Sequence, residues 1–214
     1  MSLRRCASNV SGRWGLAATV VCGAVLAVAA PTRAQPANGR LIIVGDRTLT
    51  YASYVFLLPP SWVPGFEQMD LTHERGIWRG RHATQPVWIQ VVPTRKEAGE
   101  TLADFVVDAK EQPKTQAGCS PDAFAKSTSF RPMLSYPYEV HTLTNCPQGT
   151  SGLLVFAELP EHVVTFNLYG RASGEADLQP YVADFGGVLR TFRWTLGLSD
   201  QAVGEMVTEL QGGT

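Results

Sequence analysis

The chain has 214 residues, of which 17% are charged, and its 18 basic and 19 acidic residues give a formal net charge of −1. Residues 1–34 hold four of the basic residues and none of the acidic ones, so the remaining residues carry 14 basic against 19 acidic side chains, a net charge of −5. Nucleic acid is therefore excluded as an expected partner, because phosphate contacts need a positive surface. The same balance argues against a polybasic site for a membrane surface.

The N-terminus has the pattern of a cleavable signal peptide. The first 15 residues contain three arginines and no acid, residues 16–30 are uncharged, and Thr32-Arg33-Ala34 provides the small-x-small cleavage site. A membrane anchor is the alternative, but the apolar run is shorter than a spanning helix requires. Lipoprotein processing at Cys22 and twin-arginine export fit the sequence less well. We therefore expect cleavage after about Ala34, a periplasmic or secreted location, and no membrane span in the mature chain.

Two cysteines remain after cleavage, Cys119 and Cys146. Two cysteines in an exported chain usually form a disulfide. Two free thiols or half of a metal site are the alternatives. A zinc site has little support, since no second cysteine lies within four residues of either one. We expect the disulfide.

The chain that remains after cleavage, residues 35–214, is long enough for one domain, and most of it reads as strands. Pro59 and Pro60 end the first predicted strand, and short turn-like segments join two pairs of the others as hairpins. In the last strand Val164, Phe166 and Leu168 alternate with polar residues, as in a half-buried strand. The predicted strands are residues 51–58, 76–82, 87–92, 124–130, 138–144, 152–159 and 163–171.

Helical periodicity appears in two segments and more weakly in a third. Residues 101–111 place apolar side chains on one face, with Thr101 as the N-cap and Pro113 as the expected end. Residues 177–192 do the same, with Asp177 as the cap and Pro180 in the first turn. The tail, residues 199–210, repeats the pattern with Val203, Met206, Val207 and Leu210. We expect it to pack on the domain, to fray, or to meet a partner protein.

The order of these elements resembles the PsbP-like superfamily, which includes the Ran-binding Mog proteins and the periplasmic DcrB-type proteins. The phrase Phe56-Leu57-Leu58-Pro59-Pro60-Ser61-Trp62, the helix start Thr101-Leu102-Ala103-Asp104-Phe105, and the ending Leu189-Arg190-Thr191-Phe192-Arg193 carry the resemblance. It covers residues 50–194, between an N-terminal tether (35–49) and an amphipathic tail (195–214). The resemblance implies an α+β fold in which an antiparallel sheet of six or seven strands is flanked by two or three helices. It also implies accessory or binding roles without a shared enzymatic activity.

The candidate binding residues are aromatic and basic. Trp78 and Trp88 lie on strands expected to pair, and if Ile77 and Ile89 face inward both tryptophans lie on the opposite face. Such a face beside arginines suits a sugar ring or an acidic peptide, whereas burial under a helix is the structural alternative. The candidate site therefore comprises Trp78, Arg79, Arg81, His82 and Trp88.

No catalytic residue, metal ligand set or cofactor is predicted. The four histidines of the mature chain show no metal-binding spacing, and Ser61 is expected to shape a turn rather than act as a nucleophile. These observations favour an exported non-enzymatic accessory protein of the cell envelope that binds a protein partner or a small ligand. The alternative is a small exported hydrolase or carbohydrate-binding module that uses the Trp78/Trp88 region.

Overall fold

The described part of the chain comprises residues 39–44, 53–70, 75–116, 119–146, 149–171 and 175–212 of a computed structural model. These residues belong to one unit, Gln35–Thr214. The predicted signal peptide, residues 1–34, lies outside the described residues, as do parts of the predicted tether.

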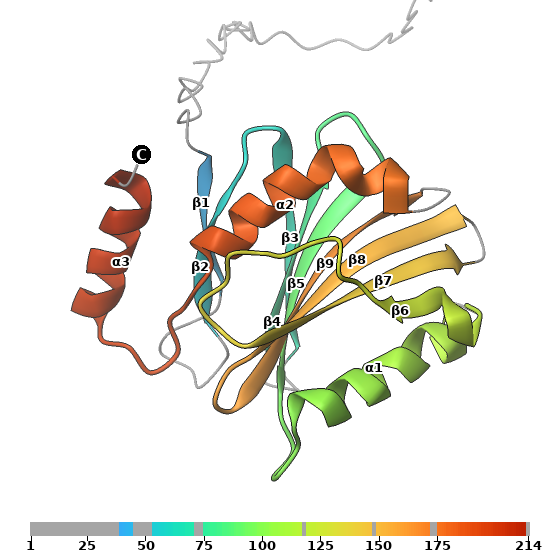
Figure 1. Cartoon of the computed structure of the whole chain (residues 1–214). Helices are drawn as coiled ribbons and strands as arrows, with labels where there is room; N and C mark the ends of the chain where they lie inside the picture. The colour runs from blue at the N-terminus through green and yellow to red at the C-terminus, as the bar shows by residue number, and fades with distance from the viewer. Residues whose placement is uncertain are drawn as a thin grey trace, which may run out of the picture. The chain divides into compact units, whose positions relative to one another are not determined.

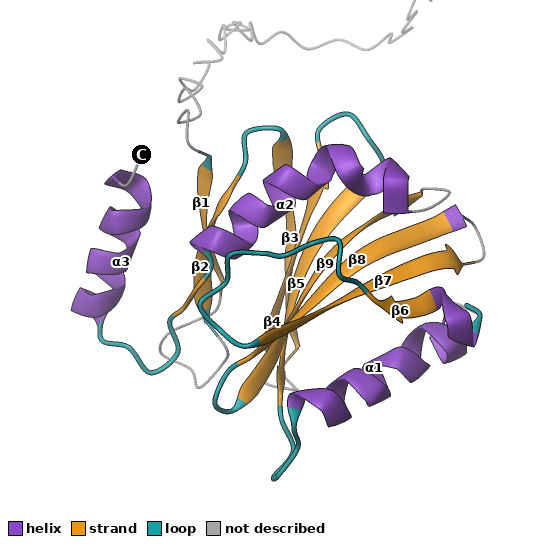
Figure 2. Cartoon of the chain, viewed as in Figure 1, coloured by secondary structure: helices purple, strands orange, loops and turns teal. Residues whose placement is uncertain are grey.

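The main element is a seven-stranded antiparallel sheet with the strand order β3-β4-β5-β9-β8-β7-β6 (Figures 1 and 2). Every neighbouring pair is antiparallel, and β9 pairs with β5 on one side and β8 on the other. The strands of this sheet are β3 (Trp62–Asp70), β4 (Arg75–His82), β5 (Val87–Arg95), β6 (Phe124–Lys126), β7 (Tyr138–Cys146), β8 (Thr150–Glu158) and β9 (His162–Arg171).

A second, three-stranded sheet has the order β1-β2-β10, formed by β1 (Arg40–Val44), β2 (Tyr54–Leu58) and β10 (Arg193–Trp194). It packs on one face of the large sheet through large apolar side chains. Phe56 meets Trp78 edge to face with ring centroids 4.9 Å apart. The hydroxyl of Tyr54 donates to the carbonyl oxygen of Gly76 at 3.0 Å.

Helices α1 (Leu102–Gln116) and α2 (Gln179–Thr191) cover opposite faces of the large sheet. Alternation along β8 shows this, because neighbouring residues of a strand point to opposite faces. Val155 belongs to the main core together with Phe185 and Val188 of α2. Phe156 belongs to a separate cluster with Val106 of α1.

Thr101 caps the start of α1, as the sequence predicted, and Asp104 adds a reciprocal hydrogen bond. The backbone N–H of Asp104 donates to Oγ1 of Thr101 at 3.2 Å, and the Asp104 carboxylate accepts from the backbone N–H of Thr101 at 3.0 Å. The Thr101 hydroxyl also donates to the Asp104 carboxylate, and this bond, with the smaller effect of the Thr101 backbone N–H, lowers the pKa of Asp104. The helix does not end at Pro113 as predicted but continues to Gln116. For α2 the expected cap is also wrong, since Leu178 occupies the N-cap position and no side chain caps the helix.

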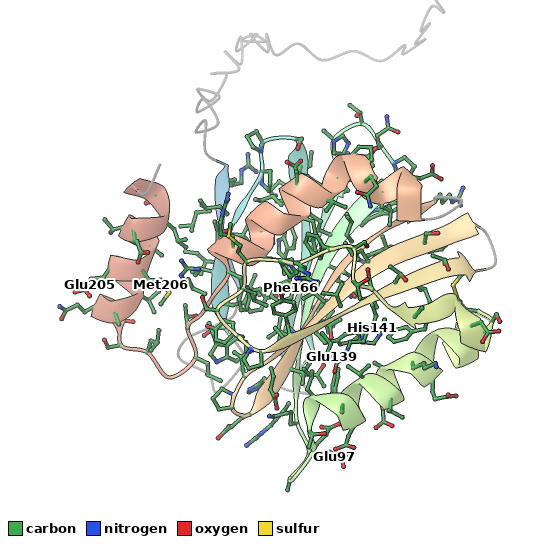
Figure 3. The ribbon with its side chains drawn as sticks, viewed as in Figure 1. Glu97, Glu139, His141, Phe166, Glu205 and Met206 are labelled. Carbon is green, nitrogen blue, oxygen red and sulfur yellow. A yellow bond between two sulfur atoms is a disulfide. The ribbon has the colours of Figure 1, made fainter. Side chains whose placement is uncertain are left out.

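The tail forms a third helix, α3 (Asp200–Gly212). Val203 and Leu210 are buried, which accounts for two of the four apolar residues in the predicted stripe. Met206 lies on the side of α3 toward the small sheet and Glu205 on the other side (Figure 3). The tail is therefore a helix packed on the domain.

A disulfide joins Cys119 to Cys146 and closes a loop with a sequence separation of 27. It attaches the short 3-10 helix η1 (Pro121–Ala123) to the end of β7. Both cysteines are buried in a small cluster with Ala123, against which Leu143 packs. The segment that follows α1 is thereby held against the sheet.

The predicted fold class is confirmed: the structure is α+β, with a seven-stranded antiparallel sheet and three helices. The sequence did not predict β1, which lies inside the expected tether, nor β3, which contains Pro64 and Gly65. The predicted strand 124–130 is shorter than expected and ends at Lys126. In β3 a register shift between Pro64 and Glu67 interrupts the pairing with β4, which explains why its sequence lacks clean alternation.

Candidate functional site

The register of the β4–β5 hairpin separates the two tryptophans of the predicted site. Arg81 pairs with Trp88, and Trp78 pairs with Val91. Residues that pair across a sheet share a face, and successive residues alternate between faces. Trp78 and Trp88 therefore lie on opposite faces, and the expectation that they share one is wrong.

Trp78 belongs to the main core. It is 3% exposed and packs against Phe56. Its ring lies across Gly80, the next residue on the same face, so closely that any Cβ at position 80 would overlap the indole. Trp78 is thus a structural residue, and a glycine makes room for it.

His82 lies near the other end of the same face, at the turn into β5. Its ring contacts Trp62 and Tyr181, with centroid distances of 5.4 Å and 5.1 Å. Nδ1 lies 3.4 Å from the backbone nitrogen of Thr84. His82 is consequently apart from Trp88, and the structure does not join it to the predicted aromatic and basic cluster.

Three of the predicted residues, Arg79, Arg81 and Trp88, do share a face, and β9 adds to them. Trp88 pairs with Tyr169, and Gln90 lies between Arg79 and Asn167 in the next row across the sheet. We call this surface the open half-face. It consists of Arg79, Arg81, Trp88, Gln90, Asn167 and Tyr169.

Helix α1 covers the other half of this same face. Its apolar residues pack on Phe124, Leu143, Leu154, Phe156 and Val163, which belong to β6, β7, β8 and the beginning of β9. Among the described residues no helix packs on the half formed by β4, β5 and the end of β9. The open half-face is therefore a sheet surface that the described part of the fold leaves uncovered.

The aromatic residues of the open half-face are in contact. The rings of Trp88 and Tyr169 lie 5.8 Å apart between centroids with an angle of 20° between their planes. The guanidinium carbon of Arg79 lies 5.9 Å from the centroid of Tyr169, in cation–π range. Partial burial raises the pKa of Tyr169, and the charge of Arg79 opposes that rise. The phenol is accordingly neutral at physiological pH.

The charge of the open half-face is positive. Arg79 and Arg81 are exposed, and neither forms an ion pair with a described residue. Strand alternation places a third exposed arginine, Arg171, on the same face, two residues beyond Tyr169. This concentration of positive charge contrasts with the negative net charge of the chain beyond residue 34.

Sequence reasoning missed Tyr169 and Asn167. The alternation in residues 163–169 already indicated that odd-numbered positions of this strand face away from the main core. What the sequence did not indicate is that β9 pairs with β5, which brings Tyr169 beside Trp88 across 81 residues of chain. The site is thus assembled by a non-local strand pair.

Two other polar clusters have structural explanations. Ser61 and Trp62 both donate a hydrogen bond to Oδ2 of Asp184. These two bonds hold the β2–β3 turn against α2. Nε2 of His141 lies 3.0 Å from the carboxylate of Glu139, and both residues project from β7 on the side of α1 (Figure 3). Burial lowers the pKa of His141, although the hydrogen bond with Glu139 opposes that effect.

Within the described ranges no group of three or more potential metal ligands comes together. The same ranges contain no helix that is both long and apolar enough to cross a membrane. An open depression of about 600 Å³ lies beside Arg95, Lys96 and Glu161, between the β5–α1 connection and the β8–β9 turn. Its charges are partly matched, since Nζ of Lys96 lies 2.9 Å from Glu158 and Arg95 lies 4.0 Å from Glu161.

No protein-family model matches the sequence, and the search of curated proteins finds no significant relative. Among solved structures the chain is similar to LpqN of Mycobacterium tuberculosis, described as involved in cell envelope biogenesis. The two share 12% sequence identity with a TM-score of 0.43, over 72% of this chain and 90% of LpqN. A likeness at this level carries no inference about function, so the proposals below rest on the residues of this chain.

Proposed function

We propose that this chain is an exported, non-enzymatic accessory protein of the cell envelope that binds its ligand or partner on the open half-face. The observation that carries the proposal is a sheet surface left uncovered in the described residues, with an aromatic pair beside arginines that form no ion pair with a described residue. Exposed aromatic and arginine side chains are enriched where proteins bind their partners. The resemblance to the PsbP-like superfamily, whose members are accessory or binding proteins, agrees with this role.

Export is the second part of the proposal. The disulfide between Cys119 and Cys146 supports it, because such bonds persist in oxidising compartments and are rare in the cytosol. The signal-peptide pattern of residues 1–34 points in the same direction. Export can be tested by fractionating cells and measuring the intact mass of the protein. We expect a chain that begins near Gln35, lies outside the cytoplasm and has no free thiol, whereas a full-length reduced chain in the cytoplasm would contradict export.

The hydrolase alternative has less support than the binding function. The hydrolase and the carbohydrate-binding module were both expected to use the Trp78/Trp88 region, and the two tryptophans lie on opposite faces. Ser61 donates to Asp184, whose Oδ2 also accepts a hydrogen bond from Trp62. The carbohydrate-binding alternative keeps its support, because the Trp88–Tyr169 pair lies on the open half-face.

Binding at the open half-face can be tested with a matched pair of variants. The mature protein, residues 35–214, would be incubated with envelope material of the source cell, and the bound fraction would be measured. The double variant Arg79→Gln/Trp88→Ala is expected to bind less than the parent protein. The variant Val107→Ala is the control, because Val107 is 64% exposed on α1, away from the open half-face. Equal retention of both variants would contradict the proposed site.

A further inference from the structure

The chemistry of the open half-face points to one class of ligand. We infer that it binds an acidic saccharide, a chain of sugar rings that carries carboxylates. This inference rests on the proposed function and names its ligand class. The ligand must satisfy three kinds of group together: aromatic rings, arginines and side-chain amides.

The aromatic pair is the reason to expect sugar rings in the ligand. Trp88 and Tyr169 are both partly exposed and lie nearly parallel, with a 20° angle between their planes. The faces of aromatic rings carry partial negative charge, which attracts the polarised C–H groups on the face of a sugar ring. A peptide of acidic residues lacks a ring of this kind, since its aspartate and glutamate side chains are short and flexible.

The arginines are the reason to expect a negatively charged ligand. Arg79 and Arg81 lie on β4 beside Trp88, and neither is paired with a carboxylate among the described residues. A guanidinium group binds a carboxylate with two parallel hydrogen bonds, and it is less strongly hydrated than an ammonium group. A neutral sugar would leave these charges without a counterpart.

The side-chain amides are the reason to expect hydroxyl groups on the ligand. Gln90 and Asn167 pair across β5 and β9, directly between Arg79 and the half covered by α1. Both side chains are partly exposed. A side-chain amide donates as well as accepts hydrogen bonds, whereas a carboxylate can only accept them. Sugar hydroxyls donate as well as accept, so an acidic saccharide matches the amides and the arginines at once.

The test uses three probes of similar length: tetragalacturonate, maltotetraose and tetraglutamate. Binding to the mature protein would be measured by titration calorimetry at low and at physiological salt. Tetragalacturonate is expected to bind at least roughly tenfold more tightly than maltotetraose, because charge-assisted hydrogen bonds to the arginines are lost with the neutral sugar. Its affinity should fall as salt is raised.

Variants locate the binding. Arg79→Gln/Arg81→Gln should weaken tetragalacturonate binding by roughly tenfold or more and remove most of its salt dependence. Trp88→Ala should weaken it as well, and Val107→Ala should leave it unchanged. Since Arg79 and Arg81 are exposed, the double variant should unfold at the same urea concentration as the parent, which excludes misfolding as the cause.

The outcomes separate this inference from the proposed function. If tetraglutamate binds and the same variants abolish that binding, the saccharide is wrong and the binding function stands. Equal affinity for maltotetraose, or binding that the variants leave intact, would also overturn the inference. If no probe binds while retention of envelope material still depends on the open half-face, only the ligand class fails. If that retention is independent of the open half-face, both proposals fail.

Discussion

The indole nitrogen of Trp62 donates a hydrogen bond of 2.8 Å to Oδ2 of Asp184, 122 residues further along the chain. Ser61 donates to the same oxygen. The turn that precedes β3 is thereby attached to the middle of α2. Trp62 is only 1% exposed, and this carboxylate is the acceptor for its N–H.

Asp184→Ala should therefore destabilise the protein. A buried donor left without an acceptor costs about 1–3 kcal/mol. Urea unfolding followed by tryptophan fluorescence measures this loss. Asp184→Asn is the control, because its side-chain oxygen retains an acceptor and the loss should be smaller. Equal stability of the parent and the alanine variant would show that the hydrogen bond contributes nothing.

The two tryptophans of the β4–β5 hairpin should respond differently to substitution. Trp78→Ala removes a buried ring and should lower the free energy of unfolding by about 3–5 kcal/mol. Trp88→Ala removes a partly exposed ring and its contact with Tyr169, so about 1–2 kcal/mol is expected. Comparing the urea midpoints of the two variants checks the assigned register. A larger loss for Trp88 would contradict the placement of Trp78 in the core.

Gly80 is expected to tolerate no larger residue. A Cβ at this position would overlap the ring of Trp78, which must then move within a packed core. Such overpacking typically costs about 1–3 kcal/mol. Gly80→Ala should lower the urea midpoint accordingly, and Gly187→Ala provides a matched control because nothing lies within 4 Å of a Cβ there. In the Gly80→Ala/Trp78→Leu double variant, part of the loss caused by Gly80→Ala should disappear.

The fold was predictable to the extent that its signals are local. The apolar alternation of β9 and the N-cap at Thr101 depend on residues close together in sequence, and both predictions agree with the structure. Strand β1 has only five residues, and it lies in the expected tether. Its pairing with β2 makes it a strand, and that pairing is not visible in the local sequence. The β3 strand was hidden by Pro64 and Gly65, which resemble a turn when they are considered alone.

The candidate site was only partly predictable for a related reason. Choosing residues 78 and 88 as partners on one face requires the register of a hairpin, and a shift of one residue transfers a side chain to the other face. The turn after His82 includes Pro86 and does not fix that register from sequence alone. Tyr169 and Asn167 depend on a pairing between β5 and β9, which lie far apart in the chain.

The disulfide should contribute measurably to stability. Closing a loop with a sequence separation of 27 is worth about 3–4 kcal/mol in the chain-entropy description. Cys119→Ser/Cys146→Ser should therefore unfold at lower urea than the oxidised parent. Adding a reductant should lower the midpoint of the parent and leave that of the double variant unchanged. A parent protein that is insensitive to complete reduction would contradict a stabilising role for this bond.

Acid should destabilise the protein through its buried histidines. Burial lowers the pKa of His141 and of His162 below 6.5, so the unfolded chain binds protons that the folded chain does not. Stability is then fully present above about pH 6.5 and is lost as the pH falls toward the lowered values. Partial burial raises the pKa of Glu139, but hydrogen bonds from His141 and Lys126 outweigh that effect and lower the pKa below 4.5. Protonation of Glu139 therefore reduces stability only at a lower pH than protonation of the histidines.

The measurement is the free energy of unfolding at pH 7.5 and pH 5. The parent should be less stable at pH 5, and the double variant His141→Gln/His162→Gln should show a smaller difference between the two conditions. Tyr169, with its raised pKa, does not titrate in this range. A parent that gains stability on acidification over this interval would contradict the assignment of both histidines.

The interrupted pairing of β3 bears on how copies of this protein behave when concentrated. A terminal strand of a sheet exposes unpaired backbone groups, and a second molecule can add its own strand there. Pro64 has no N–H to offer such a strand, and the register shift between Pro64 and Glu67 bends the backbone away from a straight template. At millimolar concentration, molecules of this protein should therefore not associate through the β3 edge. Restoring a regular strand there would allow edge-to-edge polymerisation.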